Sequence, residues 1–291
     1  MTPAALSVRA LPSIPLPGRV LMTTPDHFRV EYVINPHMAG NVGDVDVALA
    51  RQQWEALRDA YARLGVEVVE LVGAPGLPDQ VFCANQTLPY CTPGGARGVI
   101  LSRMHAEQRK PEVEHYERFF KGEGYETTGL DPDLPGDFEG MGDAIWHPGR
   151  YLLWGGYGYR TDRSVYERLT DNLGFPVLPL ELTDPDFYHL DTCLCPLDEE
   201  TALYFPGAFT EAGRETIKAH FSRTIEAPEA DARDRFACNA HSPDGTHVLI
   251  QQGCDETNGL LRAAGYEVIE LDTGEFLKSG GSVFCMKLMF W

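Results

Sequence analysis

Apolar and polar positions repeat along this chain in a unit that occurs five times. Each unit has apolar residues at helical spacing, followed by a short apolar run that is typical of a buried strand. The units span residues 56–71, 115–130, 165–180, 217–230 and 258–271. A glycine separates helix from strand in four of them, at positions 65, 124, 174 and 265, where it fits a helix C-cap. Such a repeat predicts a closed array of α/β units.

The clearest helix is predicted over residues 44–64, where Trp54, Leu57 and Tyr61 keep near-helical spacing and Asp44 can cap the first turn. Further helices are predicted over residues 106–120, 161–173, 210–221 and 254–264. Strands are predicted over residues 19–25, 28–35, 66–71, 98–102, 151–156, 177–182, 201–206 and 247–252. This alternation excludes an all-β propeller. An open doubly wound sheet would also alternate, but no glycine-rich phosphate-binding motif follows a strand.

The repeat favours one large domain over residues 19–291, preceded by a flexible lead-in at residues 1–18. The lead-in is rich in proline and has neither a long apolar core nor an amphipathic transit pattern. No window approaches the roughly 18 consecutive apolar residues of a membrane span. Seven cysteines, an odd number, fit a reducing compartment better than a disulfide framework, so we expect a cytoplasmic protein.

The net charge of the chain indicates which classes of binding partner are disfavoured. The chain has 24 Lys and Arg against 43 Asp and Glu, a net charge of −19, and it contains no basic run. Nucleic acids and anionic membranes are disfavoured, because both need a basic footprint. An acidic surface suits a cationic small molecule, although solubility explains the charge equally well. The sequence leaves a homo-oligomer open.

Polar and nucleophilic side chains that could take part in catalysis follow the strands of the repeat. Four of them stand 15 to 20 residues after the glycine of their unit: Asn85, Glu139, His189 and Cys285. Equivalent positions in a closed ring would direct these side chains to one centre. The fourth unit lacks the glycine and offers only the segment 236–241.

Cys285 is a candidate nucleophile. It lies in a segment that begins with Gly280 and Gly281, ahead of a final strand that ends at Trp291. Paired glycines let backbone and ligand approach closely. Reactivity requires a lowered pKa or a neighbouring acid/base group. A buried core cysteine is the alternative interpretation, since that is the commonest fate of a free thiol.

His189 is the candidate acid/base group. Alternation along a predicted strand places His189, Asp191 and Cys193 on one face, with Asp191 able to hold a histidine. A structural histidine is the alternative. Glu139 and Asp143, which are flanked by glycines, add two carboxylates. In a dry pocket these carboxylates would need cationic partners, because an unpaired buried charge is costly. A solvated turn is the alternative interpretation. A guanidinium, planar and rich in N–H donors, fits such a pair.

A metal site is not expected. The pair Cys193 and Cys195 has no second pair at zinc-finger spacing, and no His-Glu-x-x-His motif occurs. The sequence therefore predicts neither a metal nor a cofactor.

Together these segments resemble the guanidine-modifying enzymes, the pentein superfamily of arginine deiminases, amidinotransferases and dimethylarginine dimethylaminohydrolases. The resemblance is nearest to the arginine dihydrolases of cyanobacterial type, through residues 22–38, 82–88, 138–146, 156–162 and 188–197. It covers nearly the whole chain after the lead-in. It implies a five-bladed α/β propeller with pseudo-fivefold symmetry, the pentein fold, and a cysteine-dependent hydrolase that uses a covalent thiouronium intermediate.

The resemblance also implies roles. Cys285 would be the nucleophile and His189 the acid/base, while Glu139 and Asp143 would hold the guanidinium. The implied substrate-binding residues are Asn35, Asn85, Arg103 and Arg160. The chain departs from the expected pattern at residues 86–88, where small residues are expected and Gln-Thr-Leu stands instead.

Asn85 bears on which reaction is catalysed. A deiminase commonly presents Asp here, and a charged Asp suits a guanidinium but repels a ureido oxygen, to which an Asn amide can donate. Asn85 therefore favours two hydrolytic rounds, from arginine to ornithine, carbon dioxide and two ammonia. An asparagine that holds its own loop is the alternative. A dimethylarginine hydrolase, a single-step deiminase that gives citrulline and, more distantly, a non-catalytic binding protein of the same fold stay open.

Overall fold

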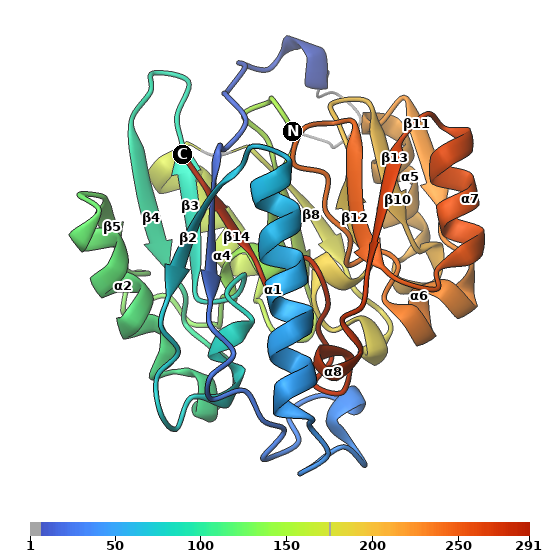
Figure 1. Ribbon diagram of the computed structural model, residues 1–291. Helices are drawn as coiled ribbons and strands as arrows, with labels where there is room; N and C mark the ends of the chain where they lie inside the picture. The colour runs from blue at the N-terminus through green and yellow to red at the C-terminus, as the bar shows by residue number, and fades with distance from the viewer. Residues whose placement is uncertain (1–6, 175) are drawn as a thin grey trace.

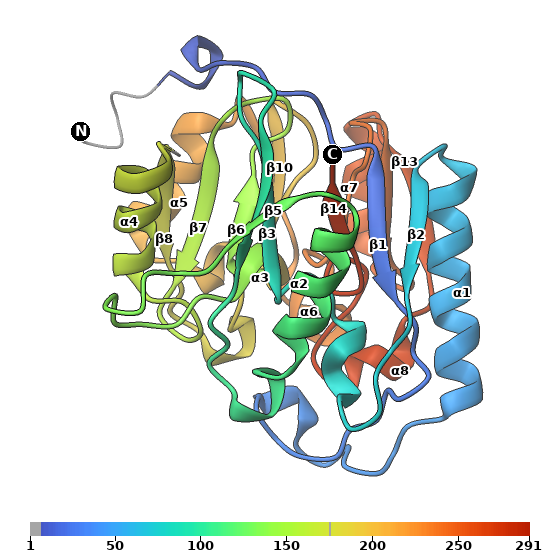
Figure 2. The same ribbon diagram turned by 90° about the vertical axis from the view of Figure 1, so that its left-hand side faces the viewer.

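One structural unit is built five times in the computed structural model, which describes residues 7–174 and 176–291. In each unit a middle strand pairs with an outer strand in parallel, and a helix connects the two. In four units the middle strand also pairs antiparallel with an inner strand. A helical crossover is the usual connection between parallel neighbours. Helices α2 and α7 lie on opposite sides of the strands in Figure 1, and Figure 2 shows α1 at the edge beside β2.

The five units follow one another along the chain. The first contains β14 (Leu288–Phe290), β1 (Arg19–Thr23), α1 (Val47–Arg63) and β2 (Glu67–Leu71). The second contains β3 (Thr87–Cys91), β4 (Arg97–Leu101), α2 (Glu112–Gly122) and β5 (Glu126–Thr128). The third contains β6 (Ala144–Trp146), β7 (Leu153–Tyr157), α4 (Arg163–Leu173) and β8 (Val177–Glu181). The fourth contains β9 (Leu194–Pro196), β10 (Thr201–Tyr204), α5 (Glu211–His220) and β11 (Arg223–Glu226). The fifth contains β12 (His247–Gln251), α7 (Asp255–Ala263) and β13 (Glu267–Leu271).

The array is closed by strands from opposite ends of the chain. β14 pairs with β1 and supplies the inner strand of the first unit (Figure 2). In the fifth unit, a single antiparallel bridge between His241 and Leu249 takes the place of the inner strand. The predicted five-unit α/β propeller is confirmed.

Short helices fill the connections. Three are α-helical: α3 (Gly140–Asp143), α6 (Glu229–Arg235) and α8 (Gly274–Leu277). Within the described residues, seven more are 3-10 turns: Val8–Ala10, Pro36–Met38, Pro78–Val81, Glu107–Arg109, Pro185–Phe187, Leu190–Thr192 and Pro206–Ala208.

The glycine punctuation of the repeat is confirmed. Gly65, Gly124, Gly174 and Gly265 have φ angles of 78°, 84°, 69° and 100°, so each takes the left-handed conformation that ends a helix cheaply. In the fourth unit, which lacks this glycine, α5 ends at Phe221 in an extended conformation with φ −108°.

Four expectations about local structure are wrong. Residues 28–35 form no strand, and the carbonyls of Phe28 and Ile34 accept from the side chains of Arg29 and Arg160 instead of from a neighbouring strand. The helix expected over residues 106–120 is divided by Pro111 into a 3-10 turn and α2. Asp46, not Asp44, caps α1, accepting from the backbone N–H groups of Ala48 and Leu49. Residues 190–192 form a 3-10 turn, so His189, Asp191 and Cys193 do not share a strand face.

Part of the predicted lead-in packs against the domain. Residues 1–6 lie outside the described residues. Further along, Ile14 is buried and its N–H donates to the carbonyl of Gly149 at 3.1 Å. The indole of Trp291 donates to the carbonyl of Pro15 at 2.7 Å. These bonds connect the segment around residue 14 to the domain.

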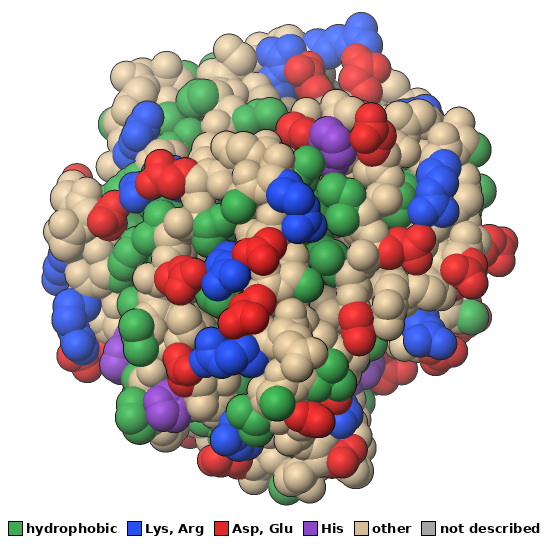
Figure 3. Space-filling view, viewed as in Figure 1, with side chains coloured by type: hydrophobic (Ala, Val, Ile, Leu, Met, Phe, Trp, Pro, Cys, Tyr) green, Lys and Arg blue, Asp and Glu red, His purple; other side chains and the backbone are tan. Residues whose placement is uncertain are grey.

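No helix in residues 7–174 and 176–291 is long and apolar enough to cross a membrane. All seven cysteines are free and buried. Acidic and basic side chains are interspersed on the face shown in Figure 3, with no broad basic area.

Candidate active site

In each unit, the segment that follows the outer strand (the link) leads to the next inner strand. Each link places one polar residue near a common centre. Asn85 precedes β3, Glu139 precedes β6, His189 precedes β9 and Cys285 precedes β14. The link of the fourth unit contributes Asn239. At the centre is a small cavity of about 20 Å³, lined by Ile34, Asn35, Met38, Asp79, Phe82, Asn85, Arg109, Arg160, Tyr188, His189, Ser279, Gly280 and Cys285.

Cys285 is held in the wall of this cavity with 3 % of its surface exposed. Its thiol donates to Oδ2 of Asp191, 3.2 Å from Sγ. Nδ2 of Asn239 donates to Sγ, also at 3.2 Å. The Oδ1 atom of Asn239 accepts from the backbone N–H groups of Ser282 and Cys285, at 3.0 and 3.3 Å. Asn239 thus positions both the backbone of the turn and the sulfur of Cys285.

The turn that presents Cys285 depends on its glycines. Gly280 has φ 82°, and a Cβ on Gly281 would lie 2.4 Å from the ring of Phe82. Any larger residue at position 281 would therefore collide with the wall of the cavity.

The thiol of Cys285 is the resting form. Burial raises its pKa well above the usual value, and the charge of Asp191 raises it further. Burial also raises the pKa of Asp191 to about 7, although the hydrogen bond from Cys285 opposes that shift. A cation in the cavity would favour the charged forms of both groups. The site is therefore arranged to become anionic when a positively charged ligand arrives.

One oxygen of Asp191 has no partner within the described part of the chain. Oδ1 is buried and accepts no hydrogen bond, whereas Oδ2 accepts from Cys285. An unpaired buried acceptor is costly, so it indicates a missing donor. The sequence suggested that Asp191 holds a histidine, but it lies beside the cysteine.

His189 and Glu139 form a buried pair. Nε2 of His189 lies 2.6 Å from Oε2 of Glu139, which also accepts from Nη1 of Arg160 at 3.4 Å. Oε1 of Glu139 accepts from the backbone N–H of His105 at 3.0 Å. Burial raises the pKa of Glu139, but the hydrogen bond and charge of His189 outweigh it and lower this pKa to about 2. Glu139 is therefore ionised and orients the imidazole ring.

Asn85 faces the cavity through its NH₂ group. Its Oδ1 accepts from Nη1 of Arg109 at 3.0 Å, and its Nδ2 lies 3.5 Å from Nδ1 of His189. A guanidinium can only donate, so the bond to Arg109 fixes which end of the amide is the oxygen. Gly142 leaves room for this arrangement, because a Cβ there would lie 2.2 Å from Nδ2.

Arg109 also lines the cavity and was not predicted as a site residue. It is buried, pairs with Glu112 at 3.0 Å and donates to the backbone carbonyls of Asp79 and Phe82. It falls inside the region expected to be one helix, where nothing marks it as a binding residue. Asp79, another cavity residue that was missed, accepts from Tyr32 and Ser279.

Arg160 and Asn35 also line the cavity. The guanidinium of Arg160 stacks 4.8 Å above the ring of Tyr188 and donates to the carbonyl of Ile34 at 2.6 Å. Nδ2 of Asn35 donates to the carbonyl of Ser279 at 3.0 Å. Together these residues form a polar rim.

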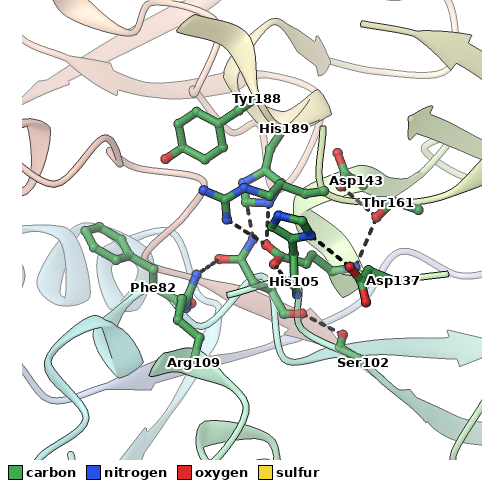
Figure 4. Close-up of polar contacts among 12 residues, drawn as sticks. Phe82, Ser102, His105, Arg109, Asp137, Asp143, Thr161, Tyr188 and His189 are labelled. Carbon is green, nitrogen blue, oxygen red and sulfur yellow. Dashed lines mark hydrogen bonds and ion pairs between the residues drawn. The ribbon is translucent and has the colours of Figure 1, made fainter. Parts of the chain in front are cut away.

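Besides Glu139, which bonds to His189, two of the predicted site residues lie outside the cavity lining. Asp143 accepts from Thr161 at 2.7 Å and from the backbone N–H of Leu190 at 3.0 Å, so both of its oxygens are used in holding the segment after His189 (Figure 4). Arg103 donates to three backbone carbonyls in the loop of residues 131–136. Neither contact set leaves a group directed at a substrate.

We expect the stability change caused by Asp191→Asn to depend on pH. Because the pKa of Asp191 is raised from 3.8 to about 7, the folded protein keeps this proton at pH values where the unfolded chain has released it. Its contribution to stability is therefore full below about pH 4 and falls as pH rises to about 7. Relative to wild type, the variant should gain up to about 1.4 kcal/mol per pH unit in that window. Urea unfolding of both proteins at pH 5, 6 and 7 measures this difference, and a constant difference would contradict it.

Comparison with known proteins supports a family assignment. The family model described as N,N dimethylarginine dimethylhydrolase, eukaryotic, matches residues 31–289. The bifunctional arginine dihydrolase/ornithine cyclodeaminase AgrE of Nostoc is 38 % identical over 93 % of this chain, which spans 37 % of that protein. The dimethylarginine dimethylaminohydrolase of Mycobacterium tuberculosis is 39 % identical over 94 % of the chain and 86 % of its own length.

Solved structures support the same family assignment. The N-terminal domain of ArgZ, an arginine dihydrolase from cyanobacteria, has been determined with its substrate bound, and it matches with a TM-score of 0.86 at 35 % identity, covering 93 % of this chain and 97 % of that domain. A dimethylarginine dimethylaminohydrolase bearing an adduct with S-methyl-L-thiocitrulline matches with a TM-score of 0.78 at 25 % identity, covering 94 % of this chain and all of the other. These neighbours confirm the predicted pentein fold. The chain therefore belongs to the N,N-dimethylarginine dimethylhydrolase family of the pentein superfamily.

Proposed function

We propose that this chain hydrolyses the guanidino group of arginine by covalent attack of Cys285, and that it is an arginine dihydrolase yielding ornithine, carbon dioxide and two ammonia. Residues 19–291 act as the single catalytic domain. The proposal depends on the groups that contact Cys285 and His189. The sulfur lies beside a buried carboxylate with one free oxygen, and the amide of Asn85 lies beside Nδ1 of His189, whose other ring nitrogen bonds to Glu139.

The first step is formation of the thiouronium. The guanidinium enters with its positive charge beside Asp191, whose free Oδ1 accepts an N–H. This charge favours loss of the Cys285 thiol proton, which His189 takes up, and the resulting thiolate attacks the central carbon. As the bond between sulfur and carbon forms, a carbon–nitrogen bond breaks, and His189 delivers the proton that lets ammonia leave.

The second step is hydrolysis of the intermediate. His189, oriented by Glu139, removes a proton from water, which adds to the same carbon. The bond to sulfur breaks, and citrulline has been formed from arginine and one water. A second round on the ureido group of citrulline consumes another water and gives ornithine, carbon dioxide and the second ammonia.

The direction of the Asn85 amide supports the second round. Because Arg109 takes the amide oxygen, the NH₂ group is left to face the cavity. It can donate to the oxygen of a ureido group, which a carboxylate at the same place would repel. Arg160 and Asn35 at the rim are proposed to bind the amino-acid end of the substrate, as is Asp79 further in.

A dimethylarginine dimethylaminohydrolase is the second candidate. It is favoured by the matching family model and by the relative from M. tuberculosis. Such an enzyme attacks the same carbon but expels dimethylamine and stops at citrulline. A non-catalytic binding protein is less well supported, because it would have no need for Cys285 beside Asp191 and for His189 beside Glu139.

Incubation of the protein with arginine tests the proposal directly. Ornithine and ammonia should appear in a ratio of one to two, with citrulline as a transient. Accumulation of citrulline without ornithine would refute the dihydrolase, and release of dimethylamine from dimethylarginine with no turnover of arginine would favour the second candidate. Protection of Cys285 by arginine against a haloacetamidine distinguishes either enzyme from a binding protein.

Replacing Asn85 by Asp should convert the enzyme toward a deiminase. A carboxylate at this position still attracts the guanidinium but repels the ureido oxygen. The first hydrolytic round should therefore persist, while the second slows by at least about tenfold. This factor corresponds to the loss of one hydrogen bond to the ureido oxygen. The ratio of citrulline to ornithine, measured by amino-acid chromatography, should rise by that factor. An unchanged ratio would show that Asn85 only holds its loop. Asn41→Asp, in a loop outside the cavity lining, is a matched control.

We also propose a cytoplasmic location. Seven free and buried cysteines are typical of a reducing compartment. Fractionation of cells that produce the protein would test it.

A further inference from the structure

A second cavity shares no lining residue with the catalytic one. Its volume is about 70 Å³, against about 20 Å³ for the catalytic cavity. Its walls are mostly apolar and include Met141, Trp146, Met289 and Trp291, and the segment around Pro15 covers part of it. Phe284, the residue before Cys285, also lines it. The cavity therefore lies directly behind the turn that carries the proposed nucleophile.

Lys287 is an unpaired amine in the wall of this cavity. Only 1 % of its surface is exposed. Its Nζ lies 3.1 Å from the centre of the Phe284 ring, and among the described residues it has no hydrogen-bond acceptor and no ion-pair partner. A buried lysine almost always has such a partner, because removing an ammonium from water is costly. Burial accordingly lowers the pKa of Lys287 to about 7.

A second donor lies beside the same ring. His241 also lines the cavity and contacts the edge of Phe284, with 5.9 Å between ring centres. Its Nδ1 shares a hydrogen bond with the hydroxyl of Tyr61 at 2.9 Å, whereas its Nε2 has no partner within the described part of the chain. When the tyrosine hydroxyl donates to Nδ1, Nε2 carries the proton and becomes a donor.

We propose that this cavity is a binding site for a small monocarboxylate with an apolar body. The carboxylate pairs with Lys287 and accepts from Nε2 of His241, while the apolar body packs against Met289 and the two tryptophans. A single carboxylate matches two donors, and a phosphate would leave most of its oxygens unpaired in these apolar walls. The charge of Asp191 reaches Lys287 only from beyond ion-pair distance, and binding supplies a counter-charge in direct contact with the ammonium.

Equilibrium dialysis with radiolabelled benzoate tests the site on the full chain. Benzoate should bind saturably, and the neutral isostere benzamide should compete at least tenfold more weakly, since it cannot pair with the ammonium. This comparison uses only the wild-type protein and so does not depend on the folding of a variant. Quenching of tryptophan fluorescence by benzoate provides a second readout, because Trp146 and Trp291 line the cavity.

Lys287→Met keeps the length of the side chain and removes its charge, and it should weaken benzoate binding at least tenfold. Lys218→Met, the same change at an exposed lysine paired with Glu226, should leave it unaltered. Saturating arginine should not displace benzoate, because the two cavities are separate. The proposal is overturned if benzamide binds as tightly as benzoate, if Lys287→Met binds like wild type, if arginine displaces benzoate, or if no saturable binding occurs.

Discussion

Replacing Cys285 by Ser should lower the turnover of arginine by about 10⁴-fold or more, the usual cost of removing a catalytic nucleophile. A serine hydroxyl is a far weaker nucleophile at neutral pH than a thiolate that is stabilised by a bound guanidinium. The fold should be retained, because a hydroxyl can keep the hydrogen bonds to Asp191 and Asn239. Ammonia release under saturating arginine measures the loss, and binding of arginine by calorimetry should persist.

Cys91→Ser is the matched control, since it makes the same change at a buried cysteine outside both cavities. Its turnover should stay within a few-fold of wild type. If Cys285→Ser instead retains a substantial fraction of wild-type activity, the nucleophile is another group and the proposed mechanism fails.

Replacing His189 by Gly should slow turnover of arginine by about 10² to 10⁴-fold, the range typical of a lost general acid/base. The variant should also trap an intermediate. S-methyl-L-thiocitrulline expels a thiolate, which needs no proton from His189, so Cys285 can still be alkylated while hydrolysis of the adduct stalls. A dimethylarginine dimethylaminohydrolase with a histidine-to-glycine change holds an adduct with this compound.

Intact mass spectrometry should show one adduct per chain of His189→Gly, and peptide mapping should place it on Cys285. The double variant with Cys285→Ser should remain unmodified. An adduct that forms and disappears as fast as in wild type would exclude His189 from the hydrolytic step.

Much of the site could be predicted because the repeat places equivalent residues at equivalent points. Asn85, His189 and Cys285 line one cavity, and Glu139 bonds to His189 from behind. The same reasoning had pointed to residues 236–241 of the fourth unit without naming Asn239, which binds the sulfur. A search for polar side chains in that link alone would have found it.

Other roles depend on contacts that no spacing reveals. Asp143 follows Glu139 closely, yet α3 turns it toward Thr161 and the backbone of Leu190. Arg103 and Arg109 stand near each other in the sequence, but only Arg109 reaches the cavity, because Pro111 divides the expected helix and leaves Arg109 in a 3-10 turn. Asp191 faces Cys285 because its segment forms a 3-10 turn and not the strand that alternation suggested.

Closure of the array by β1 and β14 has a consequence for folding in the cell. β1 emerges early from the ribosome, and one of its edges stays unpaired until residues 288–290 have been made. An open strand edge invites association with other chains, so nascent molecules need a chaperone or rapid synthesis most during this interval. Cys285 directly precedes β14, so one late event both seals the exposed edge and brings the nucleophile into place. Incomplete chains are therefore the most prone to aggregate and at the same time catalytically silent.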